Sequence, residues 1–163
     1  MTLRIAVLGV GRIGKMHAEL IARRVPGAAL AMVQDINADA AAAVGGQFDV
    51  PFTTDVDEVL GSSDVDAVAI CSSTDTHVPL MIASAKAGKA ILCEKPISLD
   101  LDKVDAALAV IDSCGVPIQV GFNRRFDPAH GEQLPSTARR RSHLGCAATR
   151  RRRPSCAPGR RSR

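Results

Sequence analysis

Short apolar runs alternate along the chain with longer segments whose apolar residues recur every three or four positions. A short apolar run is typical of a strand buried on both faces, and the longer spacing is typical of a helix with one buried side. The pattern predicts strands at residues 3–8, 29–34, 66–71, 90–93 and 117–121, with a shorter one at 51–53. It predicts helices at residues 12–25, 38–45, 55–61, 76–87 and 100–114.

Polar residues mark where three of these helices begin. Asn37, Asp55 and Asp100 stand at the start of periodic segments, where their side chains can accept hydrogen bonds from free N–H groups of the first turn. Strands and helices that alternate through short connections predict an α/β fold, a doubly wound parallel sheet of the Rossmann type. Ligands of such sheets bind outside the carboxyl ends of the strands.

The composition fits one globular domain with a different segment attached. Hydrophobic residues make up 46% of the 163 residues and aromatic ones only 2%, so we expect a core of Val, Ile, Leu and Ala. Five cysteines without a C-x-x-C pair or metal-ligand spacing predict reduced thiols, no metal site and a cytoplasmic protein. No apolar run is long enough for a membrane span or a signal peptide.

The charge changes sign along the chain. Residues 1–130 hold 11 Lys and Arg against 16 Asp and Glu, whereas residues 131–163 hold ten Arg and one Glu. The second stretch contains no Val, Ile, Met or Phe and can bury almost nothing, which predicts a disordered, Arg-rich tail. We therefore expect a Rossmann domain at residues 1–122, a connection at 123–130 and this tail at 131–163.

The most specific motif is a glycine run between the first predicted strand and helix. Gly9, Gly11 and Gly14 are spaced as Gly-x-Gly-x-x-Gly, and Asp35 ends the next strand. In dinucleotide-binding folds the first glycine permits the turn, the second admits a pyrophosphate and the third lets the helix pack close to the strand. An acidic residue at this distance accepts hydrogen bonds from the adenosine ribose.

The residues after this strand favour NAD over NADP. The carboxylate of Asp35 would repel a 2′-phosphate, and the next residues, Ile36 and Asn37, supply no cation to reverse that. The sequence therefore predicts an NAD site.

Three further motifs follow the later strands and carry a resemblance. They are Cys-Ser-Ser-Thr-Asp-Thr-His at 71–77, Glu-Lys-Pro at 94–96 and Gly-Phe-Asn-Arg-Arg-Phe-Asp at 121–127. With the glycine run, they resemble the Gfo/Idh/MocA oxidoreductase family over residues 3 to about 130, and within it the inositol 2-dehydrogenases. Glu-Lys-Pro is the most specific of these marks.

The resemblance implies roles for individual residues. Lys95 would be the catalytic residue, hydrogen-bonding the substrate hydroxyl and stabilising the developing alkoxide. Glu94 would orient Lys95 or the nicotinamide side, and Pro96 would fix the backbone. His77 would either line the cofactor or make a local hydrogen bond at a helix start, whereas His17 would be structural and face away from the chemistry. The other implied cofactor-binding residues are Arg12, Ile13, Ser72, Ser73, Thr74, Asn123 and Arg124.

The implied activity is oxidation of a polyol or sugar hydroxyl to a ketone by hydride transfer to NAD. Another sugar dehydrogenase of the family and a non-catalytic NAD-binding module are the alternatives. Family members are homo-oligomers with a second α/β domain that carries the catalytic base in an Asp-x-x-x-His motif. This chain lacks that motif, so we expect it to be inactive and not properly assembled.

Two interpretations of the Arg-rich tail remain. It is either a basic arm that binds nucleic acid through phosphates, or the product of a shifted reading frame in a GC-rich gene. The absence of Lys from the tail favours the second interpretation and argues against nucleic acid as a partner.

Overall fold

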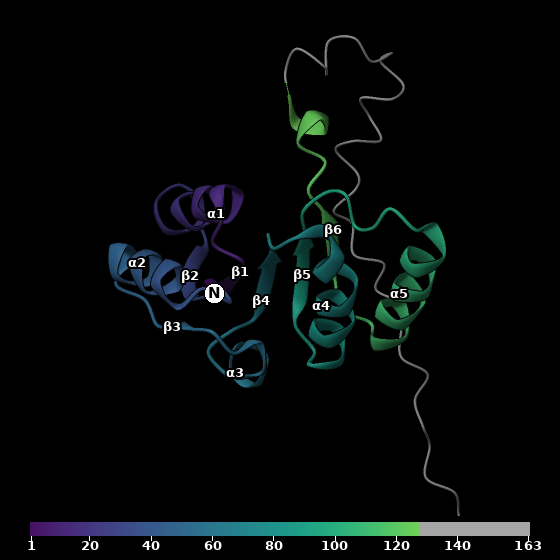
Figure 1. Ribbon diagram of the computed structural model, residues 1–163, viewed down its shortest axis with the longest axis horizontal. Helices are drawn as coiled ribbons and strands as arrows, with labels where there is room; N and C mark the ends of the chain where they lie inside the picture. Colours follow the sequence, from purple (N-terminus) through teal and green to yellow (C-terminus); the bar gives the residue numbers. More distant parts are fainter. Residues whose placement is uncertain (128–163) are drawn as a thin grey trace, which may run out of the picture. The chain divides into compact units, whose positions relative to one another are not determined.

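A computed structural model describes residues 1–127 of the chain (Figure 1). The first compact unit is Met1–Phe122, and Asn123 begins the second. Residues 128–130 of the predicted connection and all of the predicted tail, with its two interpretations, lie outside the described residues.

The first unit is a parallel sheet with helices in its crossovers, which confirms the predicted α/β doubly wound fold (Figure 1). Its strand order is β3-β2-β1-β4-β5-β6. The strands are β1 (Leu3–Leu8), β2 (Ala28–Gln34), β3 (Phe52–Thr53), β4 (Ala67–Ile70), β5 (Ala90–Cys93) and β6 (Ile118–Val120). The helices are α1 (Arg12–Arg23), α2 (Ala38–Phe48), α3 (Val56–Gly61), α4 (Thr74–Lys86) and α5 (Leu101–Cys114).

Two apolar clusters form the core, one on each face of the sheet. Side chains of α1 and α2, among them Ile21 and Val44, pack against Val7 and Val33 on one face. On the other face the buried residues of α3, α4 and α5 pack against alternate residues of β1, β4 and β5. Apolar side chains on both faces explain why the strands are continuous apolar runs rather than alternating ones.

The three predicted helix caps are confirmed. Asn37, Asp55 and Asp100 accept hydrogen bonds from N–H groups in the first turns of α2, α3 and α5. Several boundaries differ from the prediction by one to three residues, most notably the end of α2 and the start of α4. Helix α2 continues past Gly45, whose missing Cβ leaves room for Phe52 of β3, and it ends where Asp49 turns left-handed at φ 54°.

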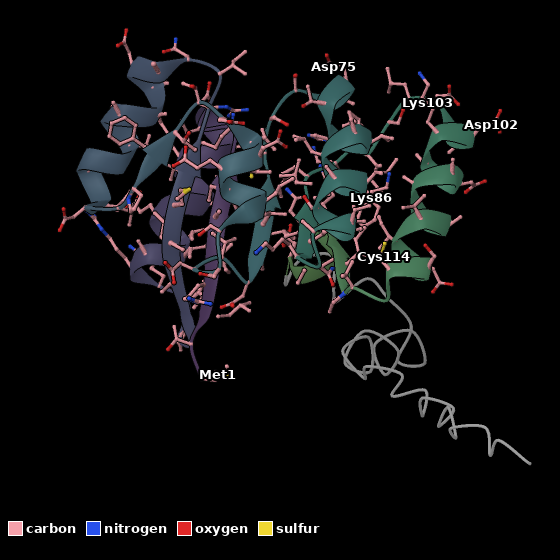
Figure 2. The ribbon with its side chains drawn as sticks, turned by 90° about the horizontal axis from the view of Figure 1, so that it is seen from below. Met1, Asp75, Lys86, Asp102, Lys103 and Cys114 are labelled. Atoms are coloured by element: carbon pink, nitrogen blue, oxygen red, sulfur yellow. The ribbon has the colours of Figure 1, made fainter. Side chains whose placement is uncertain are left out.

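The second difference lies at the start of α4, which begins at Thr74, two residues earlier than expected. Ser73 is its N-cap residue in an extended conformation, and Pro79 is accommodated inside the helix. Figure 2 shows Asp75 and Asp102 in the first turns of α4 and α5, on the same side of the molecule. The two helices therefore point the same way, as parallel crossovers require.

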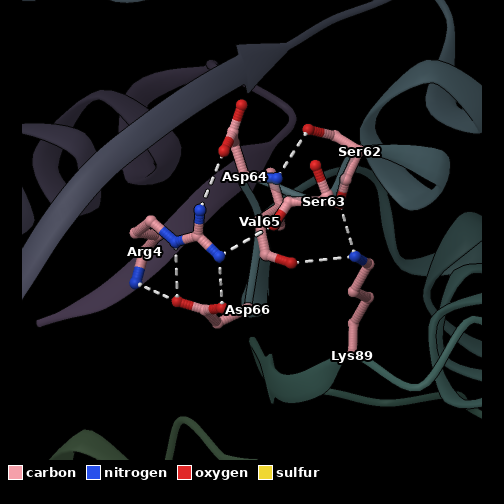
Figure 3. Close-up of polar contacts among 7 residues, drawn as sticks. All are labelled: Arg4, Ser62, Ser63, Asp64, Val65, Asp66 and Lys89. Atoms are coloured by element: carbon pink, nitrogen blue, oxygen red, sulfur yellow. Dashed lines mark hydrogen bonds and ion pairs between the residues drawn. The ribbon is translucent and has the colours of Figure 1, made fainter. Parts of the chain in front are cut away.

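Ion pairs and hydrogen bonds connect the segments at the amino-terminal ends of the strands (Figure 3). The guanidinium of Arg4 on β1 donates to both carboxylate oxygens of Asp66, just before β4, at 3.1 and 2.8 Å. The side chain of Lys89, before β5, donates to the carbonyls of Ser62 and Val65 at 2.7 and 2.8 Å. Hydrogen bonds from Arg4 lower the pKa of Asp66 to about 2. This network lies at the edge of the sheet opposite the strands' carboxyl ends.

Candidate functional site

The register of the sheet brings the predicted motifs to one edge. Leu8 pairs with Gln34 on one side and with Ile70 on the other, and the row continues through Cys93 to Val120. The next residue of each strand begins a loop, so the glycine turn, Asp35 and the three later motifs all leave the sheet at its carboxyl edge.

Two glycines of the turn, Gly9 and Gly14, have neighbouring atoms where a Cβ would lie. The third, Gly11, faces open space. Gly9 has a φ of +85°, and a Cβ there would lie 2.6 Å from the Ser72 Cα. A Cβ on Gly14 would collide with the Gly9 carbonyl, whereas one on Gly11 would meet nothing within 4 Å. The open position lies at the N-terminus of α1, which no side chain in the described part of the chain caps. Free N–H groups facing open space suit a phosphate.

Asp35 follows β2 and supports the turn. Its Oδ2 accepts the Val10 N–H at 2.7 Å, and its Oδ1 accepts the Asn37 N–H at 2.9 Å. A carboxylate oxygen has two lone pairs, so each can accept one further hydrogen bond from a ligand. The backbone contacts hold the carboxylate in place before any ligand arrives.

Five of the predicted residues line one pocket of about 340 Å³ beside β2 and β4. These are Gly9, Gly11, Asp35, Ser72 and Ser73. Sequence reasoning missed the other residues that line the pocket, which come from strand ends and from α3 and α4. They are Gln34, Ile36, Val56, Cys71, Thr76 and Leu80. Thr76 and Leu80 follow Ser72 at helical spacing, a pattern that could have indicated them.

The hydroxyl groups at the start of α4 are oriented by one another. The Thr76 hydroxyl donates to the Ser73 carbonyl at 2.7 Å and lies 2.6 Å from the Ser72 hydroxyl. Because Thr76 has a single hydroxyl hydrogen, Ser72 is the donor in the second contact. The lone pairs of Ser72 are left to accept hydrogen bonds on the pocket side.

The pocket wall includes a thiol that stays protonated. Burial, with the nearby Glu94 carboxylate as a smaller cause, raises the pKa of Cys71 to about 12. The same causes raise the pKa of Cys93 to about 12, and both cysteines are free. The two residues are small apolar groups, as the sequence predicts, and not nucleophiles.

Three predicted residues lie beside the pocket without lining it. Arg12 is exposed and Ile13 half-buried in the first turn of α1, and Thr74 is the half-buried first residue of α4. Asn123 and Arg124 belong to the second unit, in a short 3-10 helix (Asn123–Phe126). There the Asn123 Oδ1 accepts the Arg124 N–H at 2.9 Å.

His77 joins two of the loops. It is 2% exposed, with Nδ1 2.8 Å from the Pro96 carbonyl and Nε2 3.1 Å from the Ser72 carbonyl. Of the two roles considered from the sequence, the local hydrogen bond is present, and the contact to Pro96 is long-range. The imidazole thus ties the Glu-Lys-Pro loop to the start of α4.

Glu94 is held on three sides. The His17 Nε2 donates to its Oε1 at 2.9 Å, and the Lys95 backbone N–H donates to its Oε2 at 3.2 Å. Gly121 lies so close that a Cβ on it would be 2.9 Å from Oε1. The Glu94 carboxylate therefore contacts the backbone of Lys95, one of the two groups that the sequence expects it to orient.

The prediction that His17 faces away from the chemistry is wrong. Helical side chains lean toward the N-terminus of their helix, so His17, in the second turn of α1, reaches back to the carboxyl edge of the sheet. The residue has a structural role, as predicted, but its partner belongs to the Glu-Lys-Pro motif.

Lys95 is exposed, and its ammonium group has no hydrogen-bond or ion-pair partner among residues 1–127. The peptide bond between Lys95 and Pro96 is cis. A free ammonium beside the site is available to a ligand. In the same part of the chain no group of three or more His, Cys, Asp or Glu side chains could hold a metal ion. No helix there is long and apolar enough to span a membrane.

Comparison with known proteins identifies the family to which residues 3–122 are similar. Residues 3–122 match the sequence model of an oxidoreductase family with an NAD-binding Rossmann fold, Gfo/Idh/MocA. The chain is 46% identical over 128 residues to the inositol 2-dehydrogenase of Rhizobium meliloti strain 1021, covering 78% of this chain and 38% of the relative. It is 42% identical over 130 residues to the scyllo-inositol 2-dehydrogenase (NAD(+)) of Bacillus subtilis strain 168, covering 79% of this chain and 38% of the relative.

A solved structure agrees with this likeness. A scyllo-inositol dehydrogenase from Lactobacillus casei, with bound NAD(H) and scyllo-inositol, matches at a TM-score of 0.76 and 31% identity. The match covers 79% of this chain and 38% of that one. The chain thus spans 38% of the length of these relatives. NAD, the cofactor predicted from the sequence, is the one that the family's description names. By its fold, its motifs and this match, the chain belongs to the Gfo/Idh/MocA family of NAD-binding oxidoreductases.

Proposed function

We propose that this chain is the NAD-binding part of a dehydrogenase that oxidises a hydroxyl group of an inositol-like polyol. The observation that carries the proposal is the pocket formed by the glycine turn, Asp35 and Ser72, at the same sheet edge as the free ammonium of Lys95. The relatives named for inositol oxidation support this substrate class. Another sugar or polyol dehydrogenase of the family is the alternative.

The residues fit an NAD molecule without rearrangement of the turn. The uncapped N-terminus of α1 beside Gly11 would receive the pyrophosphate, since no Cβ fills that position. Asp35 would accept the hydroxyl hydrogens of the adenosine ribose through its remaining lone pairs. Neither Ile36 nor Asn37 supplies a cation for a 2′-phosphate, which supports NAD over NADP.

Lys95 would act on the substrate. When bound, the nicotinamide supplies the hydride acceptor for the oxidation. The Lys95 ammonium would donate a hydrogen bond to the substrate hydroxyl oxygen and stabilise the negative charge that develops there. Glu94 and His17 would serve this step by fixing the Lys95 backbone.

The described residues hold a polarising group but no free base next to it. His17 is engaged with Glu94, and His77 is buried between two backbone carbonyls. Removal of the hydroxyl proton is worth about 10²–10⁴-fold in rate. We therefore propose that this 163-residue chain holds NAD but does not turn over a polyol.

Two further properties follow from the same proposal. The whole protein would be a homo-oligomer acting on a small-molecule substrate, as in other family members. Three free cysteines among residues 1–127 support work in the cytoplasm, where thiols are kept reduced.

The test measures NAD and NADP affinity of the full chain by calorimetry. The unaltered chain should bind NAD more tightly. Asp35→Asn keeps a side-chain oxygen for the Val10 N–H but removes the charge, so NAD should bind about tenfold weaker or more, and the NAD/NADP ratio should narrow. Asp39→Asn, an exposed change in α2, is the control and should alter neither affinity. Tighter NADP binding by the unaltered chain would contradict the proposal.

A further inference from the structure

Gln34 is a buried polar residue that has no role in the proposed function. It ends β2, directly before Asp35, and the residue is only 3% exposed. It nevertheless lines the pocket. A buried amide needs partners for its nitrogen and its oxygen, because each unsatisfied polar group costs free energy.

One half of the Gln34 amide is satisfied inside the protein. Its Nε2 donates to the Thr54 carbonyl at 3.1 Å. A carbonyl oxygen only accepts, so this contact decides which end of the amide is nitrogen. Rotating the amide by 180° would place two oxygens against each other. Thr54 therefore locks the side chain with its Oε1 turned away from the backbone of the β3–α3 loop.

The other half of the amide has no donor among residues 1–127. No side-chain nitrogen or oxygen in that part of the chain is both fully buried and without a partner. The Oε1 of Gln34 is thus accessible, and the accessible space that this residue borders is the pocket. The pocket wall presents a fixed hydrogen-bond acceptor.

The surroundings of this acceptor suit a flat, largely apolar ring. Ile36, Val56 and Leu80 line the pocket with it. Asp35, the candidate ribose ligand, is the neighbouring residue in the chain. A ring attached to that ribose would lie between apolar side chains, with Gln34 as a neutral polar group that could contact its edge.

We propose that Gln34 recognises the base of the dinucleotide by accepting a hydrogen bond from the exocyclic amino group of adenine. The inference rests on the proposed NAD site and adds the group that selects the base. A purine with an oxo group at the same position, such as hypoxanthine, would place oxygen against oxygen. Because Thr54 locks the amide, Gln34 cannot turn its nitrogen toward such a base.

The experiment compares NAD with nicotinamide hypoxanthine dinucleotide, which differs at that position, using calorimetry on the full chain. NAD should bind about five- to tenfold more tightly, the range of a neutral hydrogen bond. Equal affinities in the unaltered chain would overturn the inference while leaving the NAD site intact. If neither dinucleotide binds, the proposed function fails and the inference fails with it.

Variants of Gln34 test whether this residue causes the preference for NAD over the hypoxanthine dinucleotide. Gln34→Met keeps the length and removes the acceptor, so the ratio of the two affinities should fall close to one. Gln47→Met, on the exposed side of α2, is the matched control and should keep the full ratio. Gln34→Ser is a second, smaller variant, used if a thermal melt shows that Gln34→Met does not fold. A folded Gln34 variant that retains the selectivity would overturn the inference.

Discussion

At the scale of single residues, the glycines of the turn show that the same residue type does different physical work. Gly9 is needed for its positive φ and for contact with the Ser72 backbone. Gly14 is needed because the Gly9 carbonyl occupies the place of its Cβ. Gly11 has open space and is suited to a ligand's close approach.

Substitution of Gly9 should therefore harm stability and binding together. In Gly9→Ala the new Cβ meets backbone atoms that cannot rotate away, and the φ of +85° is strained for alanine. We expect a loss of about 1–3 kcal/mol in unfolding free energy, with weaker NAD binding. Urea denaturation and calorimetry measure the two effects.

Gly46→Ala is the matched control for this substitution. Gly46 lies inside α2, and a Cβ there meets nothing within 4 Å, so alanine should be neutral or stabilising. Equal behaviour of the two variants would contradict the packing argument for the turn.

At the scale of elements, loops from distant parts of the chain are tied together by polar contacts. His17 connects α1 to the loop after β5, and His77 connects that loop to the start of α4. Both histidines act on the Glu-Lys-Pro segment, one through the Glu94 side chain and the other through the Pro96 carbonyl. The position of Lys95 thus depends on two helices that do not contain it.

Removing one of these contacts should make the Glu-Lys-Pro segment more mobile. In His17→Ala, Glu94 loses the donor to its Oε1, and the Lys95 N–H should exchange with solvent faster. Hydrogen exchange read by mass spectrometry would show faster exchange in the peptide that contains residues 94–96. Met16→Ala, an exposed change on the same helix, should leave that peptide unchanged. Unchanged exchange in His17→Ala would show that the contact does not hold the loop.

The ion pair between Arg4 and Asp66, at the amino-terminal ends of the strands, should make the stability of the protein depend on pH in the acidic range. Because Arg4 lowers the pKa of Asp66 in the folded protein to about 2, the carboxylate stabilises the fold above its ordinary pKa of 3.8. That contribution is lost as the pH falls from 3.8 through about 2. Asp66→Asn should therefore melt at a lower temperature than the unaltered chain at pH 6, and the difference should shrink toward pH 2.

Asp64→Asn provides the control for this pair. The Asp64 side chain is 85% exposed and meets Arg4 through one contact of 2.9 Å, so its removal should matter less. A difference between Asp66→Asn and the unaltered chain that stays constant from pH 6 to pH 2 would contradict the assignment.

At the scale of the whole molecule, the chain spans 38% of the length of its relatives while forming the complete strand order of a doubly wound sheet. The unit Met1–Phe122 carries the pocket and Lys95. Under the proposed function, binding of NAD should therefore be measurable in this chain separately from oxidation of a polyol.

We expect the purified chain to produce no NADH from NAD and myo-inositol above a Lys95→Ala control. In the proposed function Lys95 polarises a hydroxyl, but both histidines among residues 1–127 are committed to other partners, so neither of them is free to remove the proton. Absorbance of NADH at saturating substrate measures this directly. Turnover that exceeds the control would contradict the prediction.

Much of the fold and part of the site followed from local sequence. Strands, helices and caps are encoded in the spacing of apolar residues and in residues such as Asn37, and the structure changed only their ends. Helix α2 continues beyond its predicted end because Gly45 serves packing against Phe52. The glycine turn and Asp35 lie within one strand–helix–strand unit, so their spacing alone indicated a dinucleotide site.

The sequence by itself determined which functional groups lie in the loop that follows each strand. The tertiary structure decided which of those groups meet. Parallel register brings the ends of β1, β2, β4, β5 and β6 to one edge, so His17 reaches Glu94 across 77 positions of the chain. The same register turned Gln34, unremarkable in the sequence, into an acceptor on the pocket wall. Such contacts depend on which strands are neighbours and which way a helix faces, and no local pattern of apolar and polar residues contains that information.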